Sequence, residues 1–355
     1  MTALAALLRR RIGLTGPMTL ADYMADCLLH PEHGYYTRQD PLGAAGDFTT
    51  APEISQIFGE VLGLCLVQSW LDHGAPSPFT LAEPGPGRGT LMADIWRATR
   101  GVGGFHAAAR VHLVEASPVL RDQQAARLSG LPVTWHETLD GLPEDRPLFL
   151  IANEFIDALP IRQFQRDPQG WREVVLGLKD GALSPALTDP APLADLDHRL
   201  ADTEPGDVVE LCPAAKPVMQ ALSSRILARG GAAIIIDYGG WRSTGDTFQA
   251  LENHAYADPF AHPGRADLTA HVDFEALARH AAPLNHSALT DQRIAQRAEV
   301  LARNLTGAAL ENHVKAFHRL TDASEMGTLF KALALVAPGS PLPPGFAPFT
   351  TETTP

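Results

Sequence analysis

The stretch FTLAEPGPGRGTLMADIWRATR, residues 79–100, joins a short apolar run to a helical pattern through a loop with three glycines. The apolar run is short and bulky, as in a buried strand, and the apolar residues after the loop recur at helical spacing. Gly85, Gly87 and Gly89 lack a Cβ, which lets the backbone pass close to a ligand. The stretch therefore predicts a strand, a ligand-binding loop and a helix in succession.

The same alternation of strands and helices continues along the chain. Short apolar runs bounded by turn residues predict buried parallel strands at Phe79–Glu83, Val111–Ala116, Pro147–Asn153 and Ala232–Tyr238, with a weaker one at Leu131–Glu137. Helical patterns lie between them, over Thr90–Thr99, Pro118–Leu128 and Pro213–Ala228. This order predicts an α/β fold of the Rossmann-like class, with a doubly wound, mostly parallel sheet.

Three segments fall outside the simple alternation. We expect a helical N-terminal extension over 1–75, a core over 76–340 with insertions at about 154–212 and 239–275, and a flexible tail over 341–355. Within the extension, Thr50 and Glu53 have the spacing of a capping box at a helix start. Within the first insertion, an alternating pattern predicts two or three strands with turns at Asp167–Gly170 and Lys179–Gly181.

Composition narrows the functional classes. The 355 residues are 45% apolar, enough for a large core, and the formal charge of −13 argues against a non-specific nucleic-acid binder while suiting a basic partner. Cys27, Cys65 and Cys212 form no C-x-x-C pair, so we expect no metal site. No apolar run approaches the ~20 residues that span a bilayer, so we expect a soluble protein without membrane insertion. The oligomeric state stays open.

The glycine loop separates three ligand classes. A triphosphate loop would need a lysine after the glycines, and none is present. The dinucleotide pattern needs a small residue where Thr90 stands, so a dinucleotide is disfavoured. The remaining pattern, an acid at Glu83 followed by alternating glycines up to Gly89, resembles motif I of class I S-adenosylmethionine-dependent methyltransferases. We expect Glu83 to serve the ammonium group of that cofactor and the glycines to lie against it.

Further cofactor contacts follow from the strand ends. Glu115 and the adjoining Ala116 end the second strand, where an acid accepts ribose hydroxyls, although NAD enzymes also place an acid there. The TWHE turn supplies Trp135 or His136 to the adenine pocket, with His136 the expected contact. Asn153 ends the fourth strand and is expected at the methionine end of the cofactor.

Longer stretches resemble one family. They are HPEHGYYTRQDPLGAAGDFTTAPEISQIFGE (30–60), GPGRGTLMADI, ANEFIDALPIRQF (152–164), IIIDYG, ADLTAHVDF (266–274) and EMGTLFKAL (325–333). Together, over roughly residues 10–335, they resemble the MidA-type methyltransferases, whose mitochondrial member is an assembly factor of respiratory complex I. The resemblance implies methylation of arginine on a protein partner, in the mitochondrial case a complex I subunit. It also implies a cytoplasmic location in bacteria and a mitochondrial matrix location in eukaryotes. Pro84 departs from the family, which usually has leucine there.

An arginine acceptor needs particular side chains. Its guanidinium is always protonated, and carboxylates can grip it bidentately and orient one nitrogen. Glu154 and Asp157 follow the fourth strand and are expected to face the acceptor, the alternative for Asp157 being a turn cap. His271 can take up the released proton, or bond a nearby carboxylate structurally. By the resemblance, the GDFTT segment folds over the cofactor, with Gly46 and Asp47 near its polar end.

Other functions remain open at this point. A methyltransferase for a small molecule would carry the same glycine loop, and so would an assembly chaperone that binds the cofactor without catalysis. A nucleic-acid base methyltransferase fits less well, because the fourth strand ends in Asn-Glu-Phe instead of an Asn-Pro-Pro-aromatic clamp and the chain is acidic.

Overall fold

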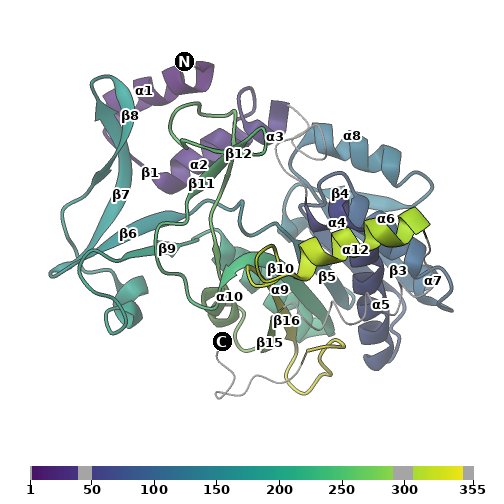
Figure 1. Ribbon diagram of the computed structural model, residues 1–355. Coiled ribbons are helices and arrows are strands. Elements are labelled where there is room, and N and C mark those ends of the chain that lie inside the picture. Colours follow the sequence, from purple (N-terminus) through teal and green to yellow (C-terminus); the bar gives the residue numbers. More distant parts are fainter. Residues whose placement is uncertain (1, 39–49, 291–306, 347–355) are drawn as a thin grey trace. The chain divides into compact units, whose positions relative to one another are not determined.

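The computed structural model describes residues 2–38, 50–290 and 307–346 of the chain, which form two compact units (Figure 1). The larger unit contains the described parts of 49–156, 218–241 and 274–355, and the smaller unit those of 1–48, 157–217 and 242–273. This division differs from the one expected from the sequence. The helices that follow residue 49 pack with the core sheet, whereas the described N-terminal residues, 2–38, pack with the two insertions.

The larger unit is built on one sheet in the order β15-β16-β10-β5-β2-β3-β4. Its strands are β2 (Phe79–Pro84), β3 (Ala109–Val114), β4 (Val133–His136), β5 (Leu148–Asn153), β10 (Gly231–Gly240), β15 (Asn285–Thr290) and β16 (Phe330–Val336). Strands β10, β5, β2, β3 and β4 run parallel. Strand β16 is antiparallel to both of its neighbours, β10 and β15, so the edge strand β15 runs in the same direction as β10. The predicted doubly wound, mostly parallel sheet is confirmed, and the antiparallel strand β16 is an addition to it.

The helices of the larger unit follow the predicted order. They are α4 (Ala51–Ile54), α5 (Gln56–Asp72), α6 (Thr90–Ala98), α7 (Phe105–Ala108), α8 (Pro118–Arg127), α9 (Ala215–Arg229, shared at its start with the smaller unit), α10 (Phe274–His280) and α12 (Gly307–Thr321), with a short 3-10 helix η1 (Leu139–Gly141). Every residue of β2 and β5 is buried, because helices cover the sheet. One apolar cluster joins α5, α6 and α7 to the sheet strands.

Helices α5 and α6 approach closely because two glycines face α6. A Cβ on Gly59 would lie 2.6 Å from the Asp94 Cβ, and one on Gly63 would lie 3.0 Å from the Ile95 Cα. The absence of these side chains lets α5 cover the helix that follows the glycine loop, so the loop is backed by two packed helices.

The predicted capping box is wrong. Thr50 occupies the N-cap of α4, but its side chain makes no cap hydrogen bond, and Ser55 separates α4 from α5. The carboxylate of Glu53 instead accepts a hydrogen bond of 2.5 Å from the Thr90 hydroxyl at the start of α6. The tertiary contact displaces the local one, because both would use the same carboxylate.

The smaller unit combines two sheets with two N-terminal helices. One sheet has the order β1-β7-β6-β9 with β8 paired to β7, and the other has the order β12-β11-β13. Its elements are α1 (Ala3–Thr15), β1 (Met18–Thr19), α2 (Leu20–Leu29), α3 (Tyr35–Arg38), β6 (Arg162–Asp167), β7 (Gly170–Lys179), β8 (Ala182–Leu187), η2 (Ala194–Arg199), β9 (Val208–Leu211), β11 (Gln249–Glu252), β12 (Ala255–Ala257), β13 (Asp267–Thr269) and β14 (Val272–Asp273). Both predicted turns of the first insertion are confirmed, because β6, β7 and β8 are joined at those positions.

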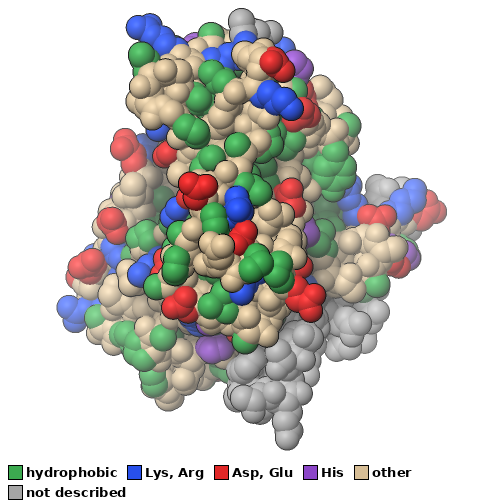
Figure 2. Space-filling view, turned by 90° about the vertical axis from the view of Figure 1, so that its left-hand side faces the viewer, with side chains coloured by type: hydrophobic (Ala, Val, Ile, Leu, Met, Phe, Trp, Pro, Cys, Tyr) green, Lys and Arg blue, Asp and Glu red, His purple; other side chains and the backbone are tan. Residues whose placement is uncertain are grey.

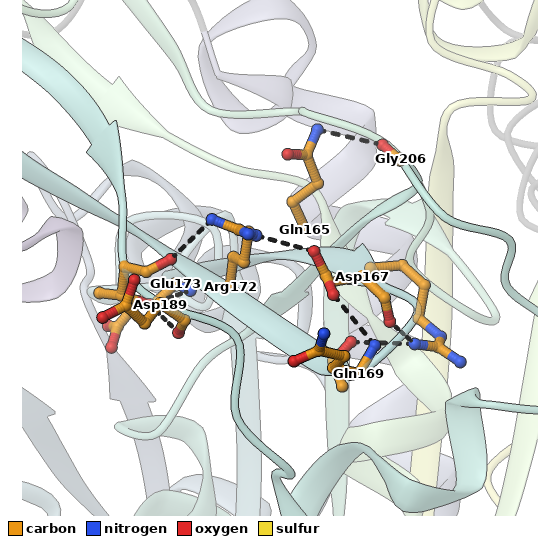
Figure 3. A network of polar contacts seen from close by, with 10 residues as sticks. Gln165, Asp167, Gln169, Arg172, Glu173, Asp189 and Gly206 are labelled. Carbon is orange, nitrogen blue, oxygen red and sulfur yellow. Dashed lines mark hydrogen bonds and ion pairs between the residues drawn. The ribbon is translucent and has the colours of Figure 1, made fainter.

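Side chains of both signs hold the β6–β7 turn together (Figure 3). The Asp167 carboxylate accepts a hydrogen bond of 2.8 Å from Arg172 Nε and one of 3.0 Å from the Gln169 backbone N–H.

Figure 2 shows acidic and basic side chains interspersed over one face, with no broad basic area on its described part.

Candidate active site

The glycine loop leaves β2 and enters α6 with three residues in the left-handed region. The φ angles of Gly85, Gly87 and Gly89 are +60°, +53° and +78°, which favour glycine at each position. The Gly85 N–H donates to the Val114 carbonyl over 2.9 Å, which ties the loop to the end of β3. A Cβ on Gly85 would lie 2.8 Å from Phe155 Cδ2, so the loop packs directly on the turn after β5.

Two buried oxygen acceptors lie at the carboxyl ends of the neighbouring strands β2 and β5. Glu83 is 3% exposed, and its Oε2 has no hydrogen-bond partner among the described residues. Asn153 is 7% exposed, and its Oδ1 also has no partner among them. The Asn153 amide orientation follows from its Nδ2, which donates to the Glu154 carboxylate over 2.8 Å. Buried acceptors without donors are costly, so this pair suits a ligand that brings N–H groups.

Burial sets the charge of Glu83. It raises the pKa of the Glu83 carboxyl to about 8, opposed only in part by a hydrogen bond from the Met92 backbone N–H in the first turn of α6. A cationic group brought beside this carboxyl would favour its ionised form. The site therefore fits the ammonium end of an amino-acid-like ligand.

Glu115 is held from two sides at the end of β3. Its Oε1 accepts from the Ser117 backbone N–H over 2.7 Å, and its Oε2 accepts from Gln124 Nε2 over 3.2 Å. Burial raises the pKa of the Glu115 carboxyl, and these two hydrogen bonds oppose that rise. Ala116, the next residue, is exposed. The carboxylate keeps further lone pairs for hydroxyl donors of a ligand.

Gln124, in α8, was not among the residues expected from the sequence. Its side chain is fully buried and contacts the glycine loop, Glu115 and the β4 residue Trp135. The sequence signal is weak, because a glutamine on the inner face of a helix is visible only once the helix is placed against the sheet.

His136 is engaged with a second histidine. His136 Nε2 lies 2.8 Å from His112 Nδ1, and the two rings stack with centroids 5.1 Å apart. Burial lowers the pKa of His136, and it lowers that of His112 to about 4, where the neighbouring His136 contributes further. Near neutral pH both rings are therefore uncharged. The adenine contact expected of His136 remains a prediction, with its Nε2 already occupied by this pair.

The turn after β5 positions Glu154 in an unusual backbone conformation. Its φ angle is +50°, which a non-glycine residue adopts only where its surroundings impose it. The Glu154 Oε1 accepts from the Ala51 backbone N–H over 2.9 Å, at the start of α4. One oxygen of the carboxylate thus joins the turn to α4.

Asp237 at the end of β10 holds this turn and was also missed. It is fully buried, and its Oδ2 accepts from the backbone N–H groups of Phe155 and Ile156 over 3.2 and 2.9 Å. Its Oδ1 accepts from the Tyr238 backbone N–H over 2.9 Å. The sequence showed an acid ending the strand IIIDY, but only the sheet order brings it beside the turn after β5.

The remaining predicted residues do not belong to the described part of the larger unit. Asp157 and His271 belong to the smaller unit, where the Asp157 carbonyl accepts from the backbone N–H of Ala270, the neighbour of His271, over 3.1 Å. The His271 backbone N–H donates to the Thr247 hydroxyl over 2.8 Å. Gly46 and Asp47 lie outside the described residues.

The described part of the chain carries neither a metal cluster nor a membrane-spanning helix. No three His, Cys, Asp or Glu side chains gather there as a metal ion would require. In the same parts of the chain, no helix is both long enough and apolar enough to cross a membrane.

Comparison with known proteins connects this geometry to a family. Residues 61–289 match a family model described as "Putative S-adenosyl-L-methionine-dependent methyltransferase". The chain belongs to this methyltransferase family. It is an S-adenosylmethionine-dependent methyltransferase, and the buried acceptors of Glu83 and Asn153 beside the glycine loop fit that cofactor.

Relatives and a solved structure extend the match to most of the chain. The methyltransferase is 37% identical over 361 residues to "Protein arginine methyltransferase NDUFAF7, mitochondrial" of Xenopus tropicalis, covering 92% of this chain and 84% of the relative. It is 36% identical over 360 residues to the Homo sapiens protein of that name, covering 92% and 81%. A Burkholderia thailandensis protein crystallised with S-adenosyl-homocysteine superposes with a TM-score of 0.81 at 28% identity, covering 94% of this chain and 92% of that one.

Proposed function

We propose that this methyltransferase methylates an arginine side chain on a protein partner. The observation that carries the proposal is the likeness, over 92% of the chain, to proteins named protein arginine methyltransferase. As the sequence resemblance implies, the partner is a subunit of respiratory complex I and the modification supports its assembly. The location is the cytoplasm in a bacterium and the mitochondrial matrix in a eukaryote.

The proposal extends to the residues that hold the cofactor. Glu83 and Asn153 hold the amino-acid end through their free buried oxygens, and Gly85, Gly87 and Gly89 form the backbone surface beside it. Glu115 with Ala116 takes the ribose, and His136 borders the adenine. S-adenosylmethionine supplies the methyl group and a neutral leaving group.

The acceptor residues act on a guanidinium that stays protonated in water. Each guanidinium nitrogen is a poor nucleophile, because its lone pair is delocalised over the group. Glu154 and Asp157 orient the guanidinium and draw its positive charge toward the nitrogens they contact, which frees the remaining nitrogen to react. His271 takes up the proton that this nitrogen releases.

The domain assignment is part of the proposal. The core over 76–340, with its insertions at about 154–212 and 239–275, carries the chemistry, and the N-terminal extension covers 1–75. Of the tail expected over 341–355, Leu342 and Phe346 pack against the core of the larger unit, and residues 347–355 lie outside the described part of the chain.

A labelling experiment tests this function. The protein is incubated with S-adenosylmethionine carrying a labelled methyl group and a lysate of its own organism, and labelled protein bands are hydrolysed to amino acids. We expect label in methylarginine. Label confined to a small-molecule fraction would indicate a small-molecule methyltransferase, and cofactor binding without any transfer would indicate an assembly chaperone; either result refutes the proposal.

A glycine variant tests the cofactor site separately. Gly87→Val places a branched side chain on a backbone with φ of +53°, so S-adenosylhomocysteine binding should fall below detection. Gly101→Val is the matched control, because a Cβ there meets nothing within 4 Å. Unchanged binding by Gly87→Val, measured by calorimetry, would show that the cofactor lies elsewhere.

A further inference from the structure

One buried polar side chain lies where three elements of the cofactor site meet. Gln124 of α8 is fully buried, whereas α8 as a whole is a polar surface helix whose other buried residue is Leu120. A buried amide is tolerated only when its hydrogen bonds are satisfied, so its partners reveal its role.

The partners determine how the amide is oriented. Trp135 Nε1 lies 2.8 Å from Gln124 Oε1, and because an indole can only donate, the amide oxygen must face it. The amide NH₂ then faces the other two partners, the Gly87 carbonyl at 2.7 Å and Glu115 Oε2 at 3.2 Å. Both of its hydrogens are used. The side chain is therefore held in one orientation by three groups from three different strand ends.

This arrangement connects the glycine loop to the acid of β3. The Gly87 carbonyl points toward α8, so the rest of that peptide is fixed in the loop that carries Gly85 and Gly89. The Glu115 carboxylate is fixed on both oxygens, by Ser117 on Oε1 and by Gln124 on Oε2. Without the Gln124 donors, Glu115 Oε2 and the Gly87 carbonyl would both lose a buried partner.

We infer that Gln124 is a positioning residue that sets the spacing between the glycine loop and Glu115 and so orients Glu115 toward the cofactor's ribose hydroxyls. The inference rests on the proposed assignment of Glu115 to the ribose and not on the nature of the acceptor. It concerns cofactor recognition alone, so cofactor binding can be measured without any acceptor.

The test combines a variant with a modified ligand. Gln124→Glu keeps the size of the side chain and an oxygen for Trp135, but it removes the NH₂ that serves Gly87 and Glu115. Gln123→Glu, the neighbouring residue on α8, makes the same change of charge at a half-buried position. Calorimetry measures the binding of S-adenosylhomocysteine and of its 2′,3′-dideoxy analogue to each protein.

The expected pattern depends on the hydroxyls. The unmodified protein should bind the dideoxy analogue about 10- to 100-fold more weakly than S-adenosylhomocysteine, as expected for hydrogen bonds to a charged group. Gln124→Glu should bind S-adenosylhomocysteine at least about tenfold more weakly than the unmodified protein does. In this variant, removing the ligand hydroxyls should lower the affinity by only about threefold or less. Gln123→Glu should behave as the unmodified protein.

Three results would overturn the inference. If Gln124→Glu weakens both ligands by the same factor, Gln124 contributes only packing. If Glu115→Gln still loses as much affinity as the unmodified protein when the ligand hydroxyls are removed, Glu115 does not bind the ribose. The arginine assignment is tested separately, by the labelling experiment alone. Should Gln124→Glu fail to fold, Trp135→Phe removes the indole N–H that orients the amide, together with part of the ring that packs against the core. It should show the same reduced dependence on the hydroxyls, and an unchanged dependence would equally contradict the inference.

Discussion

Replacing Glu83 by glutamine should stabilise the cofactor-free methyltransferase near neutral pH and weaken its binding of the cofactor. Burial raises the pKa of this carboxyl from 4.5 to about 8. Because the folded-state pKa is the higher one, the folded protein keeps a proton that the unfolded chain releases. The stability that this proton confers is complete below pH 4.5 and is lost as the pH rises toward 8, so the free energy of unfolding falls over that range.

The magnitude follows from the two pKa values. At pH 7 the unfolded carboxyl lies about 2.5 pH units above its pKa of 4.5, and each unit corresponds to about 1.4 kcal/mol, so the loss is about 3 kcal/mol. Glutamine has the same shape and no charge to bury, so Glu83→Gln does not lose stability in this way. Between pH 4.5 and pH 7, the free energy of unfolding of the variant should therefore rise by about 3 kcal/mol relative to that of the unmodified protein.

The assay is urea unfolding of the cofactor-free protein at a series of pH values. Glu325→Gln, at an exposed position of the larger unit, is the control for loss of one carboxylate. Calorimetry at pH 7 should show S-adenosylhomocysteine binding about tenfold more weakly to Glu83→Gln, because a charged acceptor is lost. If the free energy of unfolding of Glu83→Gln and that of the unmodified protein changed in parallel with pH, the conclusion that the buried Glu83 carboxyl is protonated would be refuted. Equal affinities would remove Glu83 from the cofactor site.

Two further predictions concern packing and the turn after β5. Gly59→Ala should lower the free energy of unfolding by about 1–3 kcal/mol in urea titrations, because its Cβ would lie 2.6 Å from the Asp94 Cβ. The control Gly101→Ala, whose Cβ would meet nothing within 4 Å, should leave it unchanged. Equal effects of the two changes would contradict the close approach of α5 and α6. Asp237→Asn should lower it by about 1–3 kcal/mol, because an amide cannot accept on both sides from the three backbone N–H groups that Asp237 serves. Asp122→Asn on the exposed side of α8 is the control for the second, and a matching loss there would show that charge alone is responsible.

The order of strands and helices could be predicted from the chain because each element carries its own pattern. The buried runs of β2, β3, β5 and β10 lie within about two residues of their predicted bounds, and so do α6, α8 and α9. Strand β16 was missed, although its apolar residues are as buried as those of β10. Its sequence FKALALV is equally compatible with a helix, and only its pairing with β10 decides the matter.

Some residues of the candidate site could be predicted from the sequence, and others could not. The glycine loop, Glu83, Glu115 and Asn153 are visible in the sequence because each follows a recognisable strand, and parallel strands bring their carboxyl ends to one edge of the sheet. Gln124 and Asp237 are not visible, because each depends on a distant partner: Gly87 lies 37 residues from Gln124, and Phe155 lies 82 residues from Asp237. The local capping box of Thr50 and Glu53 was wrong for a related reason, since Glu53 bonds Thr90 of another helix instead.

By itself, the sequence of this methyltransferase determined which segments are strands and helices, that a glycine loop meets an acid, and to which family the chain belongs. These depend on residues close together in the chain, whose propensities and spacing act locally. The tertiary structure decided which residues join the N-terminal helices in a separate unit and which buried side chains hold the loop, the acid and the turn in place. Those depend on contacts between distant segments, whose free energy is gained only when the sheet order brings them together.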